Sequence, residues 1–346
     1  MTPAAPAEVR DKADVLEHPR RPPLWRRPRY RALQRAQRTV WGHVFVDRGG
    51  DQRDTVWVVG GGKSGTTWIA EFINHRNDHR YMFEPLTPPY VPEFAHFRRG
   101  QYLRPAQADP RFADPMRALL TGRLRNRWAD HLNCAPVAER RLIKDVHANL
   151  LLRWAYDNLP GVRIVMVIRH PLAVIVSRMD TAPVVPFHEF DPEPARFLEQ
   201  QDLVDDFLAP HVHGIAAAST LVEQHAYWWC IENVVPLRQF RPGEIHIVCY
   251  EHLRWNPERE VQRLAAYLGT DLSSAQTKLR RPSRTAGYGG SLSRGVDPGT
   301  AWTKRVDSSE VRAAMRIVSA FGLDELYGDD PRPRVDDISK VMAAVA

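Results

Sequence analysis

The sequence predicts an α/β domain with a central, mainly parallel β-sheet flanked by helices. Apolar and β-branched runs at 56–59, 163–168 and 245–249 are typical of buried strands. Helical stretches follow the first two runs, at 66–73 and from Pro171 onward. Parallel strands need a crossover connection, usually a helix, so this alternation favours a parallel sheet. With 346 residues and 43% hydrophobic content, the chain can bury a large core.

The first predicted strand leads through a glycine-rich turn into the first helix. Glycines at 60–62 precede Lys63, and the hydroxyl residues Ser64 and Thr66 can each cap the helix. Free N–H groups at a helix N-terminus bind anions, and glycines let the backbone approach the ligand. Lys63 adds a point charge, so the segment predicts a phosphate site rather than an ordinary tight turn. The triphosphatase pattern does not fit, because Trp57 stands where its first glycine belongs.

The predicted strand at 163–168 ends in a second candidate anion-binding segment. Arg169 follows the strand directly, and Ser177 lies eight positions later. Pro171 suits the first turn of a helix, where its missing N–H is no loss. The alternative interpretation is a surface arginine and an unrelated helix serine.

Both segments resemble the nucleotide-binding motifs of sulfotransferases that use 3′-phosphoadenosine 5′-phosphosulfate (PAPS). The run Lys63-Ser64-Gly65-Thr66-Thr67-Trp68 is similar to the family's 5′-phosphosulfate loop, and Arg169 with Ser177 is similar to its 3′-phosphate site. The resemblance implies a P-loop-like three-layer fold. It also implies that Lys63 contacts the transferring group and that Trp68 lies against the adenine. Arg169 and Ser177 would hold the 3′-phosphate.

Three shorter matches extend the resemblance over residues 55–327. Phe83-Glu84-Pro85-Leu86 resembles a segment of carbohydrate sulfotransferases, and Lys144-Asp145-Val146 resembles the segment before their second strand. Tyr250-Glu251 resembles an element at the end of a strand, whose tyrosine approaches the adenine. His170 departs from the resemblance, because the family usually has Asp or Asn at this position.

The family's C-terminal cofactor loop is matched only loosely, by Ser293, Arg294 and Gly295 with a later Trp302. The residues that the resemblance assigns to the cofactor are Lys63, Ser64, Gly65, Thr66, Thr67, Trp68, Arg169, Ser177, Tyr250, Ser293, Arg294 and Gly295.

Sulfuryl transfer needs positive charge beside the leaving group, a role that fits Lys63, and a base for the acceptor's proton. Glu84 is the preferred base, because its motif matches more closely and Pro85 fixes the chain after a predicted second strand. His147 is the alternative, since an imidazole suits proton transfer near neutral pH. It lies roughly where cytosolic aryl and steroid sulfotransferases have Lys-x-His, although here the spacing is Lys-x-x-His. Each candidate could instead be structural, Glu84 pairing with an arginine and His147 capping a helix. Lys144 could help bind sulfate or be a half-exposed lysine at a strand end.

The predicted organisation is a Pro- and Arg-rich lead-in at 1–54, a single catalytic domain at 55–330 and a tail at 331–346. Prolines and acidic residues mark an insertion at 181–218, which is expected to carry substrate contacts or to form a solvated face. The aromatic-rich stretch 219–240 predicts a core helix.

The net charge of +7 favours an anionic partner, and arginines without acidic residues fill the segment 20–41. This segment predicts a peripheral contact with an anionic membrane surface, binding to nucleic acid, or, as a structural alternative, a solvated basic arm or a first helix packed on the core. No nucleic-acid motif is visible, so no nucleic-acid partner is predicted. Three widely spaced cysteines and the lack of a signal-peptide core predict a cytoplasmic protein, peripheral to the inner membrane at most.

The preferred hypothesis is a PAPS-dependent sulfotransferase that needs no metal and acts on a small-molecule, carbohydrate or glycolipid hydroxyl. One alternative is a P-loop-type nucleotide kinase or NTPase, which the failed triphosphatase pattern disfavours. The other is a non-enzymatic basic binding protein that docks on acidic surfaces.

Overall fold

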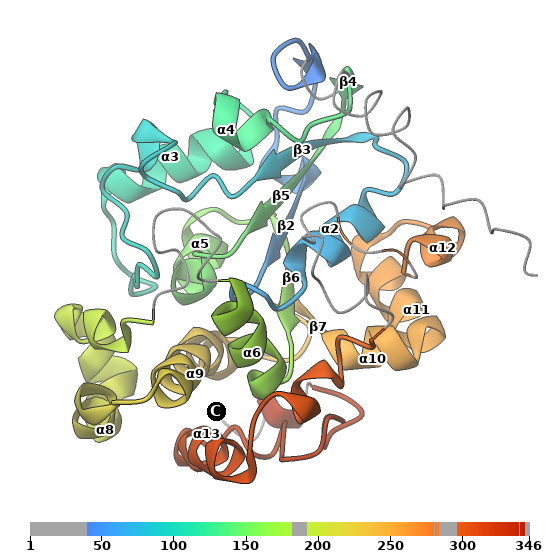
Figure 1. The fold of residues 1–346 in the computed structure, drawn as a ribbon. Helices are drawn as coiled ribbons and strands as arrows, with labels where there is room; N and C mark the ends of the chain where they lie inside the picture. Colours follow the sequence, from blue (N-terminus) through green and yellow to red (C-terminus); the bar gives the residue numbers. More distant parts are fainter. Residues whose placement is uncertain are drawn as a thin grey trace, which may run out of the picture.

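A five-stranded parallel β-sheet forms the centre of the molecule (Figure 1). The structure, a computed structural model, describes residues 40–181, 192–279, 281, 283, 296–338 and 340–342. The strand order is β3-β5-β2-β6-β7, and every neighbouring pair is parallel. These strands are β2 (Thr55–Val59), β3 (His79–Phe83), β5 (Arg140–Asp145), β6 (Arg163–Ile168) and β7 (His246–Cys249). The predicted α/β fold with a parallel sheet is confirmed.

Helices cover both faces of the sheet, which makes three layers. The larger helices are α2 (Thr66–Ile73), α3 (Pro110–Leu120), α5 (Leu152–Asn158), α6 (Pro171–Thr181), α9 (Leu221–Gln239), α11 (Pro257–Leu268) and α13 (Ser308–Ala320). Shorter helices are α4 (Arg127–Asp130), α7 (Gln201–Leu203), α8 (Val212–Ala217), α10 (Tyr250–Trp255) and α12 (Gln276–Leu279). Short 3₁₀ helices and one π-helix, η8, complete the described elements: η2 (Gln52–Asp54), η3 (Pro92–Phe94), η4 (Asn149–Leu151), η7 (Pro194–Glu199), η8 (Val204–Leu208), η9 (Ala209–His211), η10 (Ser273–Ala275) and η12 (Ala301–Lys304).

Alternating side chains of the strands divide the core in two. In β2, Trp57 and Val59 pack with α3, α5, α6, α9 and α13, whereas Val56 and Val58 pack with α2, α10, α11 and α12. This alternation follows from the pleat of a strand, and burial on both faces explains its continuous apolar sequence. The helices predicted at 66–73, from Pro171 and at 219–240 correspond to α2, α6 and α9.

All five strands end at the same edge of the sheet, because they are parallel. The loop after β2, Arg169 after β6 and Tyr250 after β7 therefore come together on one half of this edge. Glu84 after β3 and the segment after β5 lie on the other half. This edge is where open parallel sheets place their ligands.

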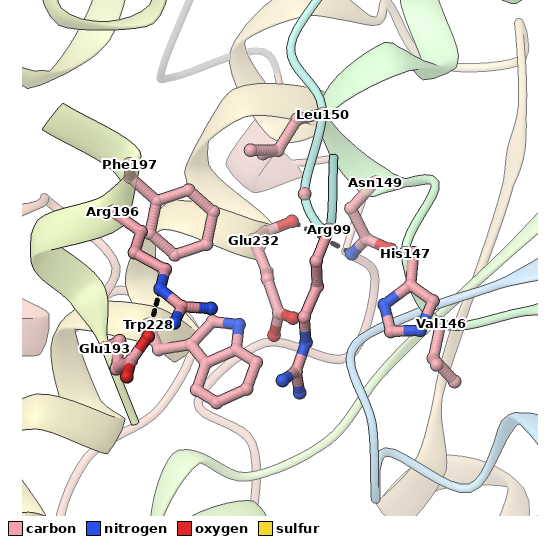
Figure 2. Close-up of a pocket in the computed structure, with 11 residues that line it drawn as sticks. Arg99, Val146, His147, Asn149, Leu150, Glu193, Arg196, Phe197, Trp228 and Glu232 are labelled. Atoms are coloured by element: carbon pink, nitrogen blue, oxygen red, sulfur yellow. Dashed lines mark hydrogen bonds and ion pairs between the residues drawn. The ribbon is translucent and has the colours of Figure 1, made fainter. Parts of the chain in front are cut away.

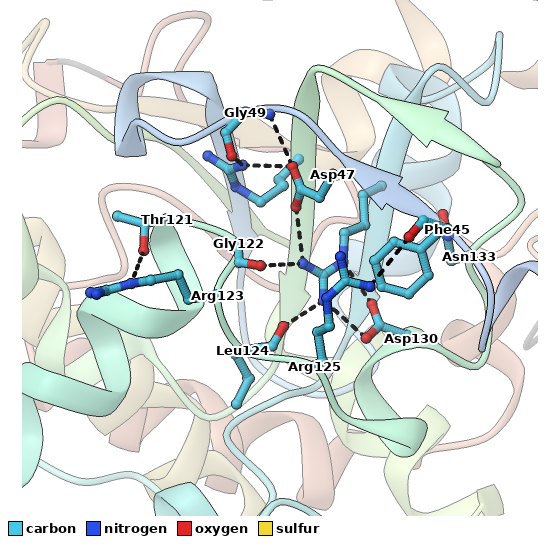
Figure 3. Close-up of polar contacts among 12 residues, drawn as sticks. Phe45, Asp47, Gly49, Thr121, Gly122, Arg123, Leu124, Arg125, Asp130 and Asn133 are labelled. Carbon is cyan, nitrogen blue, oxygen red and sulfur yellow. Dashed lines mark hydrogen bonds and ion pairs between the residues drawn. The ribbon is translucent and has the colours of Figure 1, made fainter.

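Two buried arginines anchor the segment before β2 to the sheet (Figure 3). The segment carries β1 (Val46–Asp47), which pairs in parallel with β4 (Val137–Ala138). The two oxygens of the Asp47 carboxylate accept hydrogen bonds from Arg80 and Arg141, each over 2.9 Å. Asp130 forms a second ion pair with Arg80, also over 2.9 Å.

The packed part of the chain extends beyond the predicted domain limits of 55–330 on both sides. Before residue 55, Asp47 is tied to the sheet, and after residue 330, Ile338, Val341 and Met342 belong to the core.

Two predicted segments fall partly outside the described residues. The basic segment 20–41 is described only at Val40 and Trp41, and the insertion at 181–218 is not described at 182–191. From 192 to 217 the insertion forms η7, α7, η8, η9 and α8. None of the helices that the structure describes is long and apolar enough to cross a membrane.

Candidate functional site

The loop between β2 and α2 contains two residues in the left-handed region, a feature of anion-binding nests. Lys63 has a φ of 73° and Gly65 a φ of 101°, both in the left-handed region. Successive N–H groups in such a conformation point into one concavity. A non-glycine residue seldom adopts this conformation, and strained residues of this kind cluster at functional sites.

The predicted cap of α2 by Ser64 or Thr66 is wrong. Gly65 occupies the N-cap position, and no side chain makes a capping hydrogen bond. The left-handed turn at Gly65 places the glycine, rather than a hydroxyl residue, at the helix start. The first-turn N–H groups of α2 therefore have no intrahelical acceptor and remain available to a bound anion.

A buried hydroxyl in the loop supports a bound ligand. Ser64 is 3% exposed, and its Oγ has no hydrogen-bond partner among the described residues. Buried hydroxyls are normally paired, so an orphan here marks a place that a ligand oxygen can satisfy. Thr66 and Thr67 are also buried beside it.

Arg169, at the end of β6, reaches across to the same loop. Its Nη1 donates to the Lys63 carbonyl oxygen over 2.9 Å, and its Nη2 donates to the Pro298 carbonyl oxygen over 2.6 Å. Its Nε is buried and has no acceptor among the described residues. Ser177 lies on α6, which starts two residues after Arg169, and is partly exposed. The structure thus joins the two predicted cofactor motifs at one place.

Aromatic side chains flank this junction. The rings of Trp68 and Tyr250 lie 5.1 Å apart, and the Arg169 guanidinium lies 4.5 Å from the Tyr250 ring. A Cβ added at Gly65 would come within 2.7 Å of the Tyr250 ring, so this position needs glycine. Trp68 and Tyr250, predicted to approach the adenine, are thus neighbours. Residues 293–295, the remaining predicted cofactor contacts, lie outside the described residues.

His170, where the resemblance has Asp or Asn, caps the helix that follows it. The N–H of Leu172 donates to the His170 Nδ1 over 3.2 Å, which caps the start of α6. Its Nε2 donates to the Gly328 carbonyl oxygen over 3.1 Å, and its ring stacks on Trp302. Burial lowers the pKa of His170 to about 4, so the ring is neutral and its Nδ1 can accept.

Glu84, the preferred base, forms a buried ion pair with Lys144. Its φ of 45° is in the left-handed region, and its N–H donates to the Lys144 carbonyl oxygen over 2.7 Å. Trp128 Nε1 donates to the Glu84 carbonyl oxygen over 3.1 Å. Glu84 thus pairs with a lysine rather than with an arginine, and Lys144 is buried rather than half-exposed.

Asp145 connects the two candidate bases. Its carboxylate accepts from the N–H of Leu86 over 2.9 Å and from the N–H of His147 over 2.7 Å. Burial raises the pKa of Asp145 to about 7. The segments that carry Glu84 and His147 are therefore held together by one buried side chain.

His147 lines a cavity of about 50 Å³ (Figure 2). Burial, with Arg99 and Lys144 nearby, lowers the pKa of His147 well below 6.5, so the ring is neutral at physiological pH. Glu84 is not among the residues that line this cavity. The cavity walls are formed by Arg99, Gly100, Val146, His147, Asn149, Leu150, Glu193, Arg196, Phe197, Trp228 and Glu232.

Arg178 and Glu232 are two residues that the sequence did not point to. Arg178 Nε donates to the Gly62 carbonyl oxygen over 3.0 Å, and its Nη2 donates to Glu232 over 2.6 Å. The pair is buried between α6 and α9. The available signal was a charged residue within each of two otherwise apolar helix segments, which predicts a buried partner.

Comparison with known families finds one match, in which the model of the sulfotransferase domain covers residues 53–283. No curated protein matches the chain. Similar solved structures include the sulfotransferase domain of the Synechococcus PCC 7002 olefin synthase, at 13% identity and a TM-score of 0.40, covering 81% of this chain and 96% of that one. Mouse sulfotransferase SULT7A1 complexed with PAP has 13% identity and a TM-score of 0.40, with 90% and 93% covered. A sulfotransferase from Alicyclobacillus acidocaldarius has 14% identity and a TM-score of 0.36, with 80% and 100% covered.

Proposed function

The chain belongs to the sulfotransferase domain family, and from this premise we propose that it transfers a sulfuryl group from PAPS to an acceptor hydroxyl. The observation that carries the proposal is the hydrogen bond from Arg169 to the Lys63 carbonyl oxygen. It brings the predicted 5′-phosphosulfate loop and the predicted 3′-phosphate arginine to one site. When bound, PAPS would supply the sulfuryl group, and 3′-phosphoadenosine 5′-phosphate (3′,5′-ADP) would be the leaving group.

Each part of the site has a role in this proposal. Lys63 places a positive charge where negative charge develops on the leaving oxygen. This interaction lowers the activation barrier because it is stronger in the transition state than in the bound substrate. Ser64 and the first N–H groups of α2 donate to the 5′ end. Arg169 and Ser177 hold the 3′-phosphate, and Trp68 and Tyr250 bind the adenine.

Glu84 is proposed to accept the proton of the acceptor hydroxyl, with His147 as the alternative. Lys144 holds the Glu84 carboxylate in place through the buried ion pair. His147 is favoured by its place in the cavity wall and by its neutral ring. Either residue would act as the general base by direct contact with the hydroxyl.

The acceptor is proposed to be a carbohydrate or glycolipid. The support is the match of Phe83-Glu84-Pro85-Leu86 to carbohydrate sulfotransferases, together with a cavity that combines aromatic and polar walls. Aromatic surface with a few placed polar groups suits a ring that has both apolar faces and hydroxyls.

Nucleotide binding tests the proposal directly. Melting temperatures are measured with 3′,5′-ADP, 5′-AMP and ATP with magnesium. Selective stabilisation by 3′,5′-ADP supports PAPS chemistry, whereas selective stabilisation by ATP with magnesium supports a kinase or NTPase. No response to any nucleotide supports a non-enzymatic binding protein. Transfer of label from PAPS to a glycan or lipid extract, with Lys63→Ala as the inactive control, then tests catalysis.

A cytoplasmic location and a peripheral contact with anionic membrane are also proposed. Cys134, Cys230 and Cys249 are free thiols, as in proteins of a reducing compartment. Arginines fill the segment 20–41, and the exposed valines Val40 and Val44 lie at its end and just beyond. Co-sedimentation with vesicles that contain anionic lipid, compared with neutral vesicles, tests this contact.

A further inference from the structure

Glu232 lies between the cavity and the phosphate loop. It comes from α9 and is one of the residues that line the cavity. A Cβ added at Gly61 would overlap its Oε2 and would lie 2.8 Å from Arg178 Nη2. The carboxylate therefore touches the backbone of the loop that carries Lys63 two residues later. One side chain thus forms part of both sites.

Arg178 fixes the orientation of this carboxylate. Its Nη2 donates to Glu232 Oε2 over 2.6 Å, while its Nε is held by the Gly62 carbonyl oxygen over 3.0 Å. Arg178 has no exposed surface, and only 8% of the Glu232 side chain is exposed. Within the described part of the chain, Arg178 is the one donor to the Glu232 carboxylate. The remaining acceptor capacity of Glu232 is therefore open to a ligand in the cavity.

Asn149 supplies a second acceptor in the same wall. Its Nδ2 donates to the Glu232 carbonyl oxygen over 2.9 Å, which holds the side chain beside α9. Its Oδ1 is buried without a hydrogen-bond partner among the described residues, and the residue is 1% exposed. A buried, unpaired acceptor is costly, so a donor supplied by a ligand would relieve this cost.

The cavity also has apolar walls, beside the polar side chains of Arg99, His147, Glu193 and Arg196. Trp228 and Phe197 face it from α9 and η7, as Figure 2 shows. Two hydrogen-bond acceptors beside aromatic surface match a ring that carries two neighbouring O–H donors and an apolar face. A ligand with a single hydroxyl would leave one of the two acceptors unpaired.

We propose that Glu232 is an acceptor-binding residue, whose carboxylate, fixed by Arg178 against the phosphate loop, binds one hydroxyl of a polyhydroxylated ring while Asn149 Oδ1 binds the next. The inference rests on the proposed sulfuryl transfer and names the acceptor class of that site. Because Glu232 also touches Gly61, a ring bound to it lies next to the loop that holds the donor end of the cofactor.

The experiment measures binding of two probes to the full chain in the presence of 3′,5′-ADP. Methyl β-D-glucopyranoside is the polyhydroxylated probe and cyclohexanol is the single-hydroxyl probe, both followed by saturation-transfer NMR. The wild type is expected to bind the glucoside at least tenfold more tightly than cyclohexanol. Glu232→Gln is expected to weaken glucoside binding about tenfold, as for loss of one charged hydrogen bond. It should still bind 3′,5′-ADP measurably, which a general loss of structure would not allow.

Glu258→Gln is the matched control, because Glu258 is exposed on α11 and is not among the residues that line the cavity. It is expected to bind both probes like the wild type. Should Glu232→Gln fail to fold, Glu232→Asp keeps the charge and shortens the side chain by one methylene. It is then expected to weaken glucoside binding severalfold while 3′,5′-ADP binding is retained.

Two results would overturn the inference. One is wild-type glucoside binding that is absent or no tighter than cyclohexanol binding. The other is unchanged glucoside binding in Glu232→Gln or, in its place, Glu232→Asp. Failure of the wild type to bind 3′,5′-ADP would instead overturn the proposed function, so the two failures are distinguishable.

Discussion

The Arg169 guanidinium donates a hydrogen bond to the carbonyl oxygen of Lys63 over 2.9 Å, joining residues that are 106 positions apart in the chain. A second donor of the same guanidinium reaches Pro298, over 2.6 Å. One side chain therefore holds together the loop after β2, the end of β6 and the C-terminal region. A planar, forked donor is needed for this arrangement, and a lysine cannot replace it.

Arg169→Lys is therefore expected to weaken 3′,5′-ADP binding by about ten- to a hundredfold, the equivalent of one charged hydrogen bond. The affinity for 5′-AMP should fall much less, because that nucleotide lacks the 3′-phosphate. Isothermal titration of both nucleotides measures the difference. Arg163→Lys is the matched control, since Arg163 lies at the start of β6 and also donates to two carbonyl oxygens, far from the site. Equal losses for the two nucleotides would contradict the assignment.

The identity of the base is tested by Glu84→Gln and His147→Ala. If Glu84 is the base, Glu84→Gln lowers turnover about a hundredfold or more while PAPS binding persists, and His147→Ala retains appreciable activity. If His147 is the base, the pattern reverses. In that case activity should persist well below pH 6.5, because burial lowers the pKa of His147 and the ring stays neutral. Turnover of labelled PAPS across pH 4–9 measures both effects. Wild-type turnover in Glu84→Gln would exclude Glu84.

Gly65→Ala is expected to damage the site more than a comparable glycine substitution elsewhere. The added Cβ would lie 2.7 Å from the Tyr250 ring and push it from its place beside Trp68. Affinity for 3′,5′-ADP should fall at least tenfold, in addition to a strain cost of about 1–3 kcal/mol.

Gly243→Ala is the control for backbone strain alone. Gly243 has a φ of 92°, and an added Cβ would meet nothing within 4 Å. It should lower the melting temperature without changing nucleotide affinity. Similar nucleotide losses in both variants would show that the Tyr250 contact does not matter.

His170→Asn is expected to change how stability depends on pH. Burial lowers the pKa of folded His170 to about 4 from 6.5, so the folded state favours the neutral ring. The contribution of this residue to the free energy of unfolding is therefore fully present above pH 6.5. It is lost as the pH falls toward 4, and the whole loss is roughly 3 kcal/mol. Asn keeps the helix cap but does not titrate.

Denaturant unfolding of wild type and His170→Asn at several pH values measures this effect. The difference in unfolding free energy should be constant above pH 7 and shift in favour of the variant between pH 6.5 and 4. A difference that does not change over this interval would contradict the buried, neutral assignment. Other buried groups titrate in both proteins and cancel in the difference.

Asp47→Asn is expected to destabilise the fold by about 3–5 kcal/mol, because it leaves Arg80 and Arg141 without a shared, buried carboxylate. Asp114→Asn is the control, since its ion pair with Arg117 is exposed and should contribute no more than about 1 kcal/mol. Urea unfolding at pH 7 compares the two. Equal, small losses would mean that the N-terminal segment is not anchored through Asp47.

The sequence predicted the elements well because local patterns determine them. Continuous apolar runs marked strands buried on both faces, and α2 begins and ends where its pattern does. The two segments of the proposed nucleotide site could be located for the same reason, since each lies within one strand-turn-helix segment. The cap of α2 was mispredicted because the left-handed conformation of Gly65 depends on its packing against Tyr250, far along the chain.

Contacts between distant segments could not be predicted from the sequence. The ion pair of Lys144 with Glu84 joins two strand ends, and that of Arg178 with Glu232 joins two helices. No periodicity encodes which charged residue meets which partner. The stretch 219–240 was predicted to be a core helix, and most of its residues are buried. That its Glu232 lies in the cavity wall depends on how α9 packs against α6, which the sequence does not reveal.

The strand order β3-β5-β2-β6-β7 has a consequence for how such an enzyme can diversify. The residues proposed to bind the sulfuryl donor follow β2, β6 and β7. Glu84 and His147 follow β3 and β5, on the other half of the same sheet edge. Mutations that change the acceptor can therefore accumulate on one half while the proposed cofactor-binding half stays unchanged. The boundary between β5 and β2 is therefore a suitable place for exchanging acceptor-binding loops between members of the family.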